Sequence, residues 1–293
     1  MGCLQIYQGL KEMKKTIWAH TLVKNEERYL WFAVMSVVDF VDKVLLWDTG
    51  STDKTVEIIK KLKEAKPDKI EVKKVGEVDI EEFTKVRQAM LDKTESDWFL
   101  IVDGDEVWWE KSIRGVVDLI QKEGDSLETI VSPYYNIVGD IYHYQDQSGG
   151  NYRIDDKKGH YNIRAVKRTI PGLHLEKPHG QQGFYDKDDV LIQERNKKGR
   201  KFLDFPYLHF TNMRRSSSRS FDISVPKRDK KLKYEIGMRF PENFAYPEVF
   251  YGDRPEIVSS PWEKMPFVYQ MRAILETPFK RIKRKLVPSK PGY

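Results

Sequence analysis

Strand-like and helix-like segments alternate through the first hundred residues, and this alternation restricts the fold more than any other feature. Residues 98–102 (WFLIV) are wholly apolar, which is typical of a central strand in a parallel sheet covered on both faces. Such alternation predicts an α/β sheet, in which ligands bind beyond the carboxyl ends of the strands. We predict strands over 16–23, 41–47, 69–75 and 98–102, and helices over 26–38, 52–65 and 80–94.

After residue 119 the pattern is richer in strands and less regular. A Gly- and Asp-rich stretch over 145–159 predicts a mobile loop. Residues 195–233 are basic and Ser-rich, and residues 240–266 are rich in Pro and aromatic residues without clear periodicity. The predicted strands of this part are 129–139, 162–168, 189–193 and 207–211.

The sharpest chemical signal is the triplet Asp103-Gly104-Asp105, which follows the apolar strand. Two carboxylates one residue apart can present oxygens to one Mg²⁺ or Mn²⁺ ion, and such an ion often shares its sphere with substrate phosphates. Most triplets of this kind are ordinary acidic loops. At the end of a buried strand, however, two adjacent carboxylates without a counter-ion would be costly, so the context favours a metal site.

Two further polar clusters follow predicted strands. Residues 48–53 (DTGSTD) combine a glycine, a helix start and two carboxylates that could accept hydrogen bonds from ribose or base. The alternative is a simple strand–turn–helix junction with Ser51, Thr52 or Asp53 as the cap. Residues 23–27 (VKNEE) end the first strand and could cap a helix and do nothing more.

Taken together, four blocks resemble family 2-type glycosyltransferases, which have the GT-A fold: a mostly parallel, Rossmann-like sheet flanked by helices. Their order and spacing agree with the family, and the match covers about residues 16–110. The resemblance implies a nucleotide-sugar donor, with a UDP-sugar as first choice, and Mn²⁺ or Mg²⁺. The blocks are residues 22–30 (LVKNEERYL), 44–58 (VLLWDTGSTDKTVEI), 83–91 (FTKVRQAML) and 97–106 (DWFLIVDGDE).

By position, the resemblance assigns Asp48 and Asp53 to base and ribose, and Arg87 to the diphosphate. Gln88 departs from the Asn usual after this Arg, and Trp47 replaces a small aliphatic residue. We place the GT-A domain at 14–213 and an acceptor-side extension at 214–293. The donor-binding residues implied in this way are Val23, Asn25, Glu26, Asp48, Ser51, Asp53, Arg87, Asp103 and Gly104, and the metal ligands are Asp103, Asp105 and His209.

His209 is the candidate third ligand because this fold often supplies a late histidine, although a lone His in an aromatic segment is commonly a core residue. An inverting transfer, which the family favours, needs a carboxylate to take the acceptor's proton. Glu176 is the first candidate base and His174 the second, from a segment that resembles a His-Glu pair of some relatives but has Leu175 between the two. Asp140, Asp186 and Asp188 stay as alternatives.

The net charge of +6 lies entirely in the C-terminal tail. Residues 270–293 hold seven basic residues and one acid, Glu276, so the rest of the chain is neutral, which argues against a nucleic-acid binder. Apolar residues recur at helical spacing over 267–286, with Thr277-Pro278 predicted to end one helix and start another. This basic amphipathic segment is either a membrane-surface element or a helix docked on the body with solvated charges.

We therefore predict a glycosyltransferase acting on a glycan, lipid-linked or protein acceptor. The single cysteine, Cys3, and the lack of a secretory signal favour a cytoplasmic protein, peripheral to the membrane if the tail binds lipid. One alternative is a nucleotidyltransferase, although residues 24–27 are not its Gly-rich phosphate loop. The other is a non-catalytic module that binds nucleic acid or membrane through residues 195–233 and 280–285.

Overall fold

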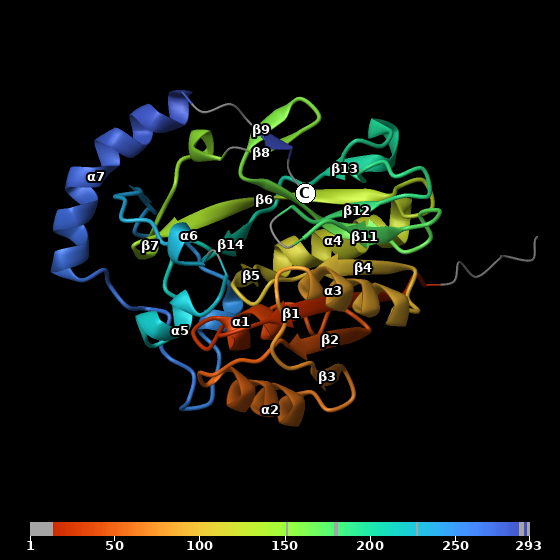
Figure 1. Ribbon diagram of the computed structural model, residues 1–293, viewed down its shortest axis with the longest axis horizontal. Coiled ribbons are helices and arrows are strands. Elements are labelled where there is room, and N and C mark those ends of the chain that lie inside the picture. Colours follow the sequence, from red (N-terminus) through yellow and green to blue (C-terminus); the bar gives the residue numbers. More distant parts are fainter. Residues whose placement is uncertain (1–13, 151, 179–180, 227, 287–289, 292–293) are drawn as a thin grey trace, which may run out of the picture.

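The computed structural model describes residues 14–293 except 151, 179–180, 227, 287–289 and 292–293. Its centre is a sheet in which β1 pairs in parallel with β2 and β4, and β2 pairs in parallel with β3. Next to β4, strand β10 (Tyr161–Lys167) is antiparallel to both β4 and β6 (Thr129–Val138) (Figure 1). The full order is β15-β7-β6-β10-β4-β1-β2-β3. The parallel strands are β1 (Ile17–Val23), β2 (Lys43–Asp48), β3 (Ile70–Lys74) and β4 (Trp98–Ile101).

Of the helices between these strands, α1 is buried over five of its six residues, whereas α2 buries one apolar side. In α2, Ile58, Ile59 and Leu62 are buried, and in α3 the backbone amide of Glu82 donates to Asp79 Oδ1, which satisfies an orphan donor of the first turn. The helices of this part are α1 (Leu30–Met35), α2 (Thr55–Ala65), α3 (Glu82–Lys93) and α4 (Glu110–Glu123).

The second half adds antiparallel and short strands around β6. The strands are β5 (Glu106–Trp108), β6 (Thr129–Val138), β7 (Asp140–Tyr144), β8 (Tyr152–Ile154), β9 (Lys157–Gly159), β10 (Tyr161–Lys167), β11 (His174–Glu176), β12 (Gly183–Tyr185), β13 (Arg200–Phe202), β14 (Tyr207–His209), β15 (Met238–Arg239) and β16 (Lys290–Pro291). The helices are α5 (Arg219–Ile223), α6 (Arg228–Lys231), α7 (Phe267–Leu286) and the 3₁₀ turns η1 (Gln147–Gly149), η2 (Lys197–Gly199) and η3 (Glu248–Phe250).

The predicted parallel sheet, its flanking helices and the C-terminal amphipathic helix are confirmed, and four local predictions are wrong. Residues 189–193 form a turn with one bridge at Leu191, because Asp186 Oδ1 accepts from the amides of Asp188 and Val190. Residues 145–159 hold η1, β8 and β9 rather than only a loop. The helix expected over 26–38 is reduced to α1, with turns on both sides.

The fourth difference concerns Pro278, which lies inside the single helix α7 instead of starting a second one. Thr277 Oγ1 donates to the Ala273 carbonyl and accepts from the backbone amide of Ile236 at 2.8 Å. These contacts hold the helix against the body at the point where proline removes a helical hydrogen bond.

The residues after 213 share the core of the sheet domain. Phe240, Tyr246, Phe250 and Val258 belong to the same buried cluster as the apolar residues of β1, β2 and α1. The domain boundary at 213/214 stays a prediction.

Candidate active site

Three polar loops meet where β1, β2 and β4 end. Val23 is in register with Asp48, and β4 runs parallel to β1, so residues 24–27, 48–53 and 103–106 leave the same edge of the sheet. Asp48 is buried, and its carboxylate accepts from the amides of Gly50 and Ser51 at 3.2 Å. Gly50 has a φ of +83°, a conformation that favours glycine. The arrangement is the one expected of a ligand site at the carboxyl end of a parallel sheet.

Asn25 ties these loops together and is fully buried. Its Oδ1 accepts from the Thr52 amide at 2.7 Å, and its Nδ2 donates to the Phe221 carbonyl at 3.0 Å. The Asn25 amide in turn donates to Ser51 Oγ at 2.9 Å. Asp53 Oδ2 accepts from Ser216 Oγ at 2.5 Å. Asn25, Ser51 and Asp53 therefore connect the loops after β1 and β2 to the segment that carries α5.

The Asp-Gly-Asp triplet is surrounded by guanidinium groups. Asp103 Oδ1 accepts from Arg87 Nη2 at 2.9 Å, and Asp103 Oδ2 lies 3.5 Å from Arg164 Nη2. Burial raises the pKa of the Asp103 carboxyl, but the charges of Arg87 and Arg164 outweigh it and hold that pKa well below its usual range. Asp105 Oδ2 accepts from Arg215 Nη1 at 2.8 Å. Burial raises the pKa of the Asp105 carboxyl, but the charge of Arg215 outweighs it and leaves that pKa lowered. Both aspartates are therefore ionised near neutral pH.

Arg164 on β10 holds the base of this loop. It ion-pairs with Glu106, and its Nε donates to Tyr207 Oη at 3.0 Å. Arg164 and Glu106 are both buried, with 2% and 0% exposure. The Arg164–Glu106 ion pair therefore anchors the acidic loop 103–106 to strand β10.

His209 lies beside Asp105 because β14 pairs with β5. His209 is in register with Glu106, and its Nε2 lies 3.6 Å from Asp105 Oδ2 and 3.7 Å from Glu106 Oε1. Burial and the charge of Arg164 lower the pKa of His209 to about 4, against the opposing effect of Asp105 and Asp103. The imidazole is therefore neutral at pH 7, the form in which histidine binds metals.

Two arginines of the extension were not predicted. Glu26 Oε1 accepts from Arg215 Nη1 at 2.9 Å and from Arg228 Nη2 at 2.5 Å, while Glu26 Oε2 has no hydrogen-bond partner among the described residues. Burial raises the pKa of Glu26 to about 8, although both arginines lower it. The only sequence signal for them is the basic stretch 195–233, whose composition does not indicate that two of its arginines pair with a buried acid.

Residue types at this edge fit a hard divalent cation. Asp103 and Asp105 supply ionised oxygens and His209 a neutral ring nitrogen, a donor set that suits Mn²⁺ or Mg²⁺ with phosphate oxygens. His209 Nδ1 is buried without a hydrogen-bond partner among the described residues. Gly104 lies close to Val23 and Glu26, because a Cβ built on it would be 2.9 Å from Val23 Cγ1.

The candidate bases lie apart from this acidic cluster. His174 and Glu176 are on β11, where His174 Nε2 is 3.5 Å from Glu176 Oε1 and 3.5 Å from Asp189 Oδ1. β11 packs on α3, and the Leu175 amide donates to Gln88 Oε1 at 2.8 Å, next to Arg87 in sequence. Within the described part of the chain, no hydrogen bond or ion pair joins Glu176 or His174 to Asp103, Asp105 or His209.

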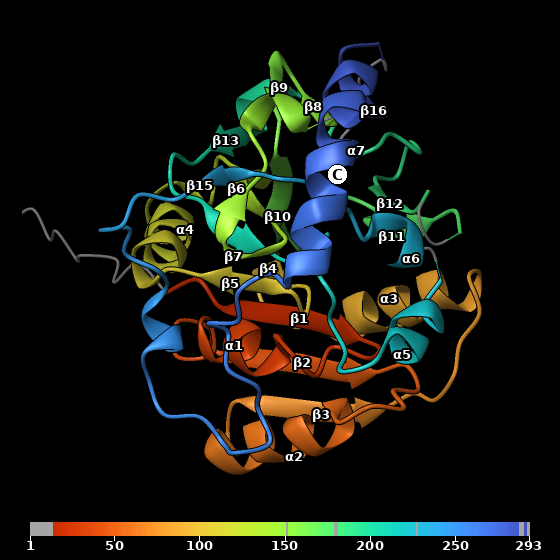
Figure 2. The ribbon, with the colours of Figure 1, turned by 90° about the vertical axis from the view of Figure 1, so that its left-hand side faces the viewer.

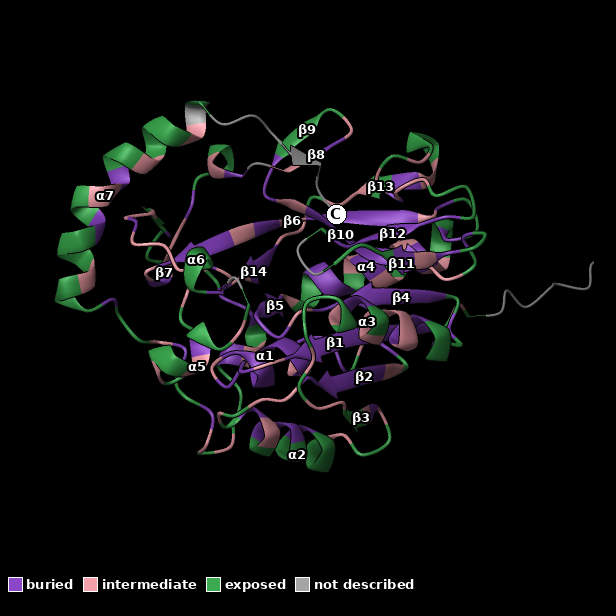
Figure 3. Cartoon of the chain, in the orientation of Figure 1, coloured by how far each residue is buried: buried purple, intermediate pink, exposed green. Residues whose placement is uncertain are grey.

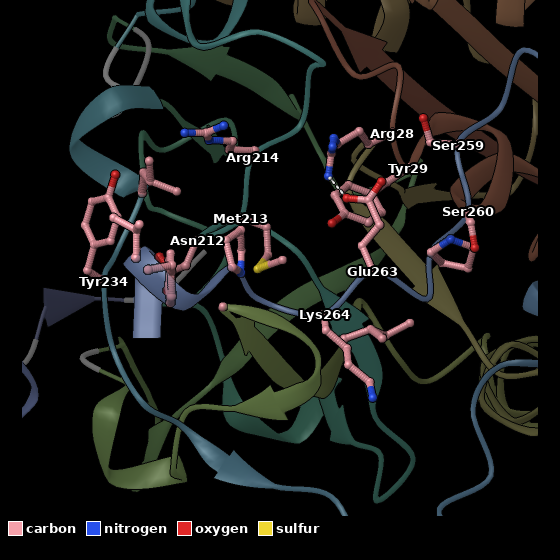
Figure 4. A pocket seen from close by; sticks show the side chains of 17 residues that line it. Arg28, Tyr29, Asn212, Met213, Arg214, Tyr234, Ser259, Ser260, Glu263 and Lys264 are labelled. Atoms are coloured by element: carbon pink, nitrogen blue, oxygen red, sulfur yellow. Dashed lines mark hydrogen bonds and ion pairs between the residues drawn. The ribbon is translucent and has the colours of Figure 1, made fainter. Parts of the chain in front are cut away.

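A cavity of about 280 Å³ is lined by residues 28–29, 139, 141 and 212–214 and by parts of residues 232–269. The segment Asn212–Arg214, which joins His209 to Arg215, forms one wall, and Tyr29 forms another (Figure 4). Arg28 reaches across to Glu263, with 2.9 Å between Nη1 and Oε2. Residues 212–214 of the cavity wall thus lie between His209 and Arg215 along the chain.

Comparison with known proteins decides the family. A model of glycosyl transferase family 2 matches residues 20–175, more than half of the chain. The chain belongs to this family. It is a glycosyltransferase with the GT-A fold, as the four sequence blocks predicted, and family membership favours this function over the nucleotidyltransferase alternative.

Among solved structures, the chain is similar to residues 1–349 of TarS from S. aureus, with a TM-score of 0.49, 15% identity, and 67% of this chain and 60% of that one covered. It is also similar to glucosyl-3-phosphoglycerate synthase from Mycobacterium tuberculosis in complex with Mn²⁺ and UDP-glucose (TM-score 0.37, 17% identity, 56% and 60% covered). A third is the mannosyltransferase PcManGT from Pyrobaculum calidifontis in complex with GDP-Man and Mn²⁺ (0.38, 17%, 54% and 46%). The chain spans less than two thirds of the length of these three structures. No curated protein matches the chain.

Proposed function

We propose that this glycosyltransferase moves a sugar from a nucleotide-sugar donor, a UDP-sugar in the first instance, to an acceptor with inversion, and that it depends on Mn²⁺ or Mg²⁺. The observation that carries the proposal is the position of neutral His209 3.6 Å from Asp105, in the Asp103-Gly104-Asp105 loop at the carboxyl end of the sheet. When bound, the cation would stabilise the negative charge that develops on the leaving nucleoside diphosphate.

The charge balance of the site supports a cation and a diphosphate entering together. Two ionised carboxylates, Asp103 and Asp105, and two acids whose pKa is raised by burial, Glu26 and Glu106, face four guanidinium groups. Asp103 and Asp105 would hold the divalent cation, and Arg87 and Arg215 lie beside these two aspartates. Guanidinium groups bind phosphate oxygens in a bidentate manner, so both arginines would then hold the diphosphate.

The donor-side loops take the remaining parts of the nucleotide. We assign base and ribose to Asp48 and Asp53, which lie at the end of β2 and before α2. Asn25, Ser51 and Val23 position these loops through packing and hydrogen bonds. Because nucleotide and metal would share one edge, Asp103 contributes to both.

The acceptor would occupy the cavity beyond residues 212–214. Its wall carries the aromatic side chains of Tyr29, Tyr234 and Tyr269, which are suited to packing against sugar rings. Glu176 stays the first candidate for the base and His174 the second. The acceptor is a glycan, a lipid-linked molecule or a protein, and the outward apolar face of α7 favours one held at a membrane surface.

The test is nucleotide release from a panel of UDP-, GDP-, dTDP- and CMP-sugars with Mn²⁺. We expect one nucleotide class to be released, and Asp103→Asn and Asp105→Asn to lose the activity. Asp253→Asn, at an exposed position of the extension, is the matched control and should keep it. Equal release by Asp105→Asn and by the control would refute the assigned site.

A further inference from the structure

Helix α7 carries its apolar side chains on the face that points away from the body. In Figure 1 the helix stands at the edge of the molecule, and in Figure 3 it is largely exposed along its length. The exposed fraction of these side chains runs from 47% for Met271 to 79% for Val268 and Leu286. At 100° per residue they form one stripe about 140° wide. Its members are Phe267, Val268, Met271, Ile274, Leu275, Phe279, Ile282 and Leu286.

The opposite face of α7 holds the helix to the body. Ala273 and Thr277 are buried there. Lys280 Nζ donates to the Tyr234 carbonyl at 2.8 Å, and Arg284 ion-pairs with buried Glu235. Because small and charged residues make these contacts, the helix cannot rotate its stripe inward without breaking them. The orientation of the stripe is therefore a property of the folded protein.

This orientation is the reverse of the usual one. A surface helix of a globular protein normally turns its apolar stripe to the core and its charges to water, and large exposed apolar patches mark interaction sites. Figure 2 shows α7 from its outer side, where it lies nearest the viewer across the sheet domain. We therefore expect an apolar partner to cover the stripe along the full length of the helix.

The charge around the stripe identifies that partner. Arg272, Arg281 and Lys283 are exposed beside it, and the single acid, Glu276, is tied to Arg272 and Lys280. A helix with an apolar face between basic flanks binds the interface of an anionic bilayer. Among the described residues no helix is apolar over a stretch sufficient to cross a bilayer, so α7 would lie on the surface.

We propose that α7 docks the enzyme on a membrane rich in anionic lipid, with its apolar stripe at the level of the acyl chains. Pro266, Val268 and Tyr269, at the start of α7, line the cavity. Because Val268 belongs both to the stripe and to the cavity lining, docking would place this wall of the cavity at the membrane, and the acceptor it would take is lipid-linked. This last step rests on the proposed function, whereas vesicle binding does not.

The experiment is flotation of the full chain with vesicles of phosphatidylcholine alone or with 30% phosphatidylglycerol. We expect the protein to float with the anionic vesicles and to stay behind with the neutral ones. Leu275→Glu/Phe279→Glu places two charges in the stripe, outside the cavity lining, and should reduce flotation at least tenfold. Val72→Glu/Ile80→Glu is the matched control, since both residues are exposed apolar positions away from α7, and it should float like the wild type.

Circular dichroism and donor-nucleotide release check that the stripe variant is folded, and both should match the control. The membrane proposal would be wrong if the wild type did not float with anionic vesicles, or if the stripe variant floated like the wild type. Neither result would bear on the proposed donor site. If the wild type does not float but forms a dimer in gel filtration, and the stripe variant is a monomer, the stripe serves self-association instead. Absence of nucleotide release by a wild type that floats would overturn the proposed function alone.

Discussion

Replacing Gly104 by alanine tests how closely the acidic loop is packed. The new Cβ would lie 2.9 Å from Val23 Cγ1 and 3.0 Å from Glu26 Cγ, while carbon atoms in contact prefer about 3.5–4.0 Å. One of the partners must therefore move by roughly 0.6 Å. Val23 is buried at the end of β1, where its carbonyl accepts from the Thr49 amide, and the Glu26 carboxylate is held by two arginines. Neither side can withdraw without losing contacts.

Overpacking of this kind costs about 1–3 kcal/mol of the free energy of unfolding, which lowers Tm by about 2–6 °C for a chain of this size. Because the loop also carries Asp103 and Asp105, we expect nucleotide release to fall by about tenfold or more. Differential scanning calorimetry and the release assay measure both effects. Gly252→Ala is the control, since a Cβ there meets nothing closer than 3.8 Å. If Gly104→Ala matched this control in Tm and activity, the packing argument would be wrong.

Three further outcomes are expected. Burial and the charges of Arg87 and Arg168 lower the pKa of His20 to about 3. Unfolded His20 therefore binds a proton below pH 6.5 that the folded form does not, and this lowers the free energy of unfolding by about 2 kcal/mol from pH 7 to pH 5. In urea titrations of His20→Gln, the free energy of unfolding should fall by about 2 kcal/mol less between pH 7 and pH 5 than in the wild type. An unchanged pH dependence in this variant would contradict the lowered pKa of His20. Arg164→Met leaves Glu106 buried without its guanidinium and should lower the free energy of unfolding by about 3–5 kcal/mol. Arg114→Met, at the exposed pair with Glu110, is the control and should lower it by no more than about 1 kcal/mol. Equal losses in the two variants would contradict the anchoring role of Arg164. EDTA should abolish nucleotide release, and added Mn²⁺ should restore it. His209→Ala should raise the Mn²⁺ concentration that gives half of the activity by roughly tenfold or more. An unchanged Mn²⁺ response in this variant would show that His209 is not a metal ligand.

The parallel half of the fold could be predicted because its signals are local. Strand β4 is a short apolar run, helices α2 and α4 each have one apolar side, and the acidic clusters fall where strands end. The second half could not be predicted in the same way. Strands such as β11 and β12 have three residues each, and their pairing depends on contacts distant in sequence. The turn at 189–193 is set by the side chain of Asp186, which no periodicity reports.

The site shows the same division. The family blocks pointed to Asp48, Asp103 and Asp105, which lie at one edge because parallel strands end together. Arg215 and Arg228 come more than a hundred residues later, and only the folded chain brings them to Glu26. The amphipathic character of α7 was likewise visible in the sequence. Which face the body buries depends on Ala273 and Thr277, whose small size permits close packing.

The most direct test of the donor site is a thermal shift with each nucleoside diphosphate and Mn²⁺, measured against each protein's own Tm without ligand. A ligand at 100 times its Kd adds about 2.7 kcal/mol of stability. We predict that one nucleotide raises the Tm of the wild type and of Asp253→Asn only when Mn²⁺ is present, and that Asp105→Asn shows no shift. An equal, Mn²⁺-independent shift in Asp105→Asn would contradict a metal-dependent donor site at Asp103, Asp105 and His209.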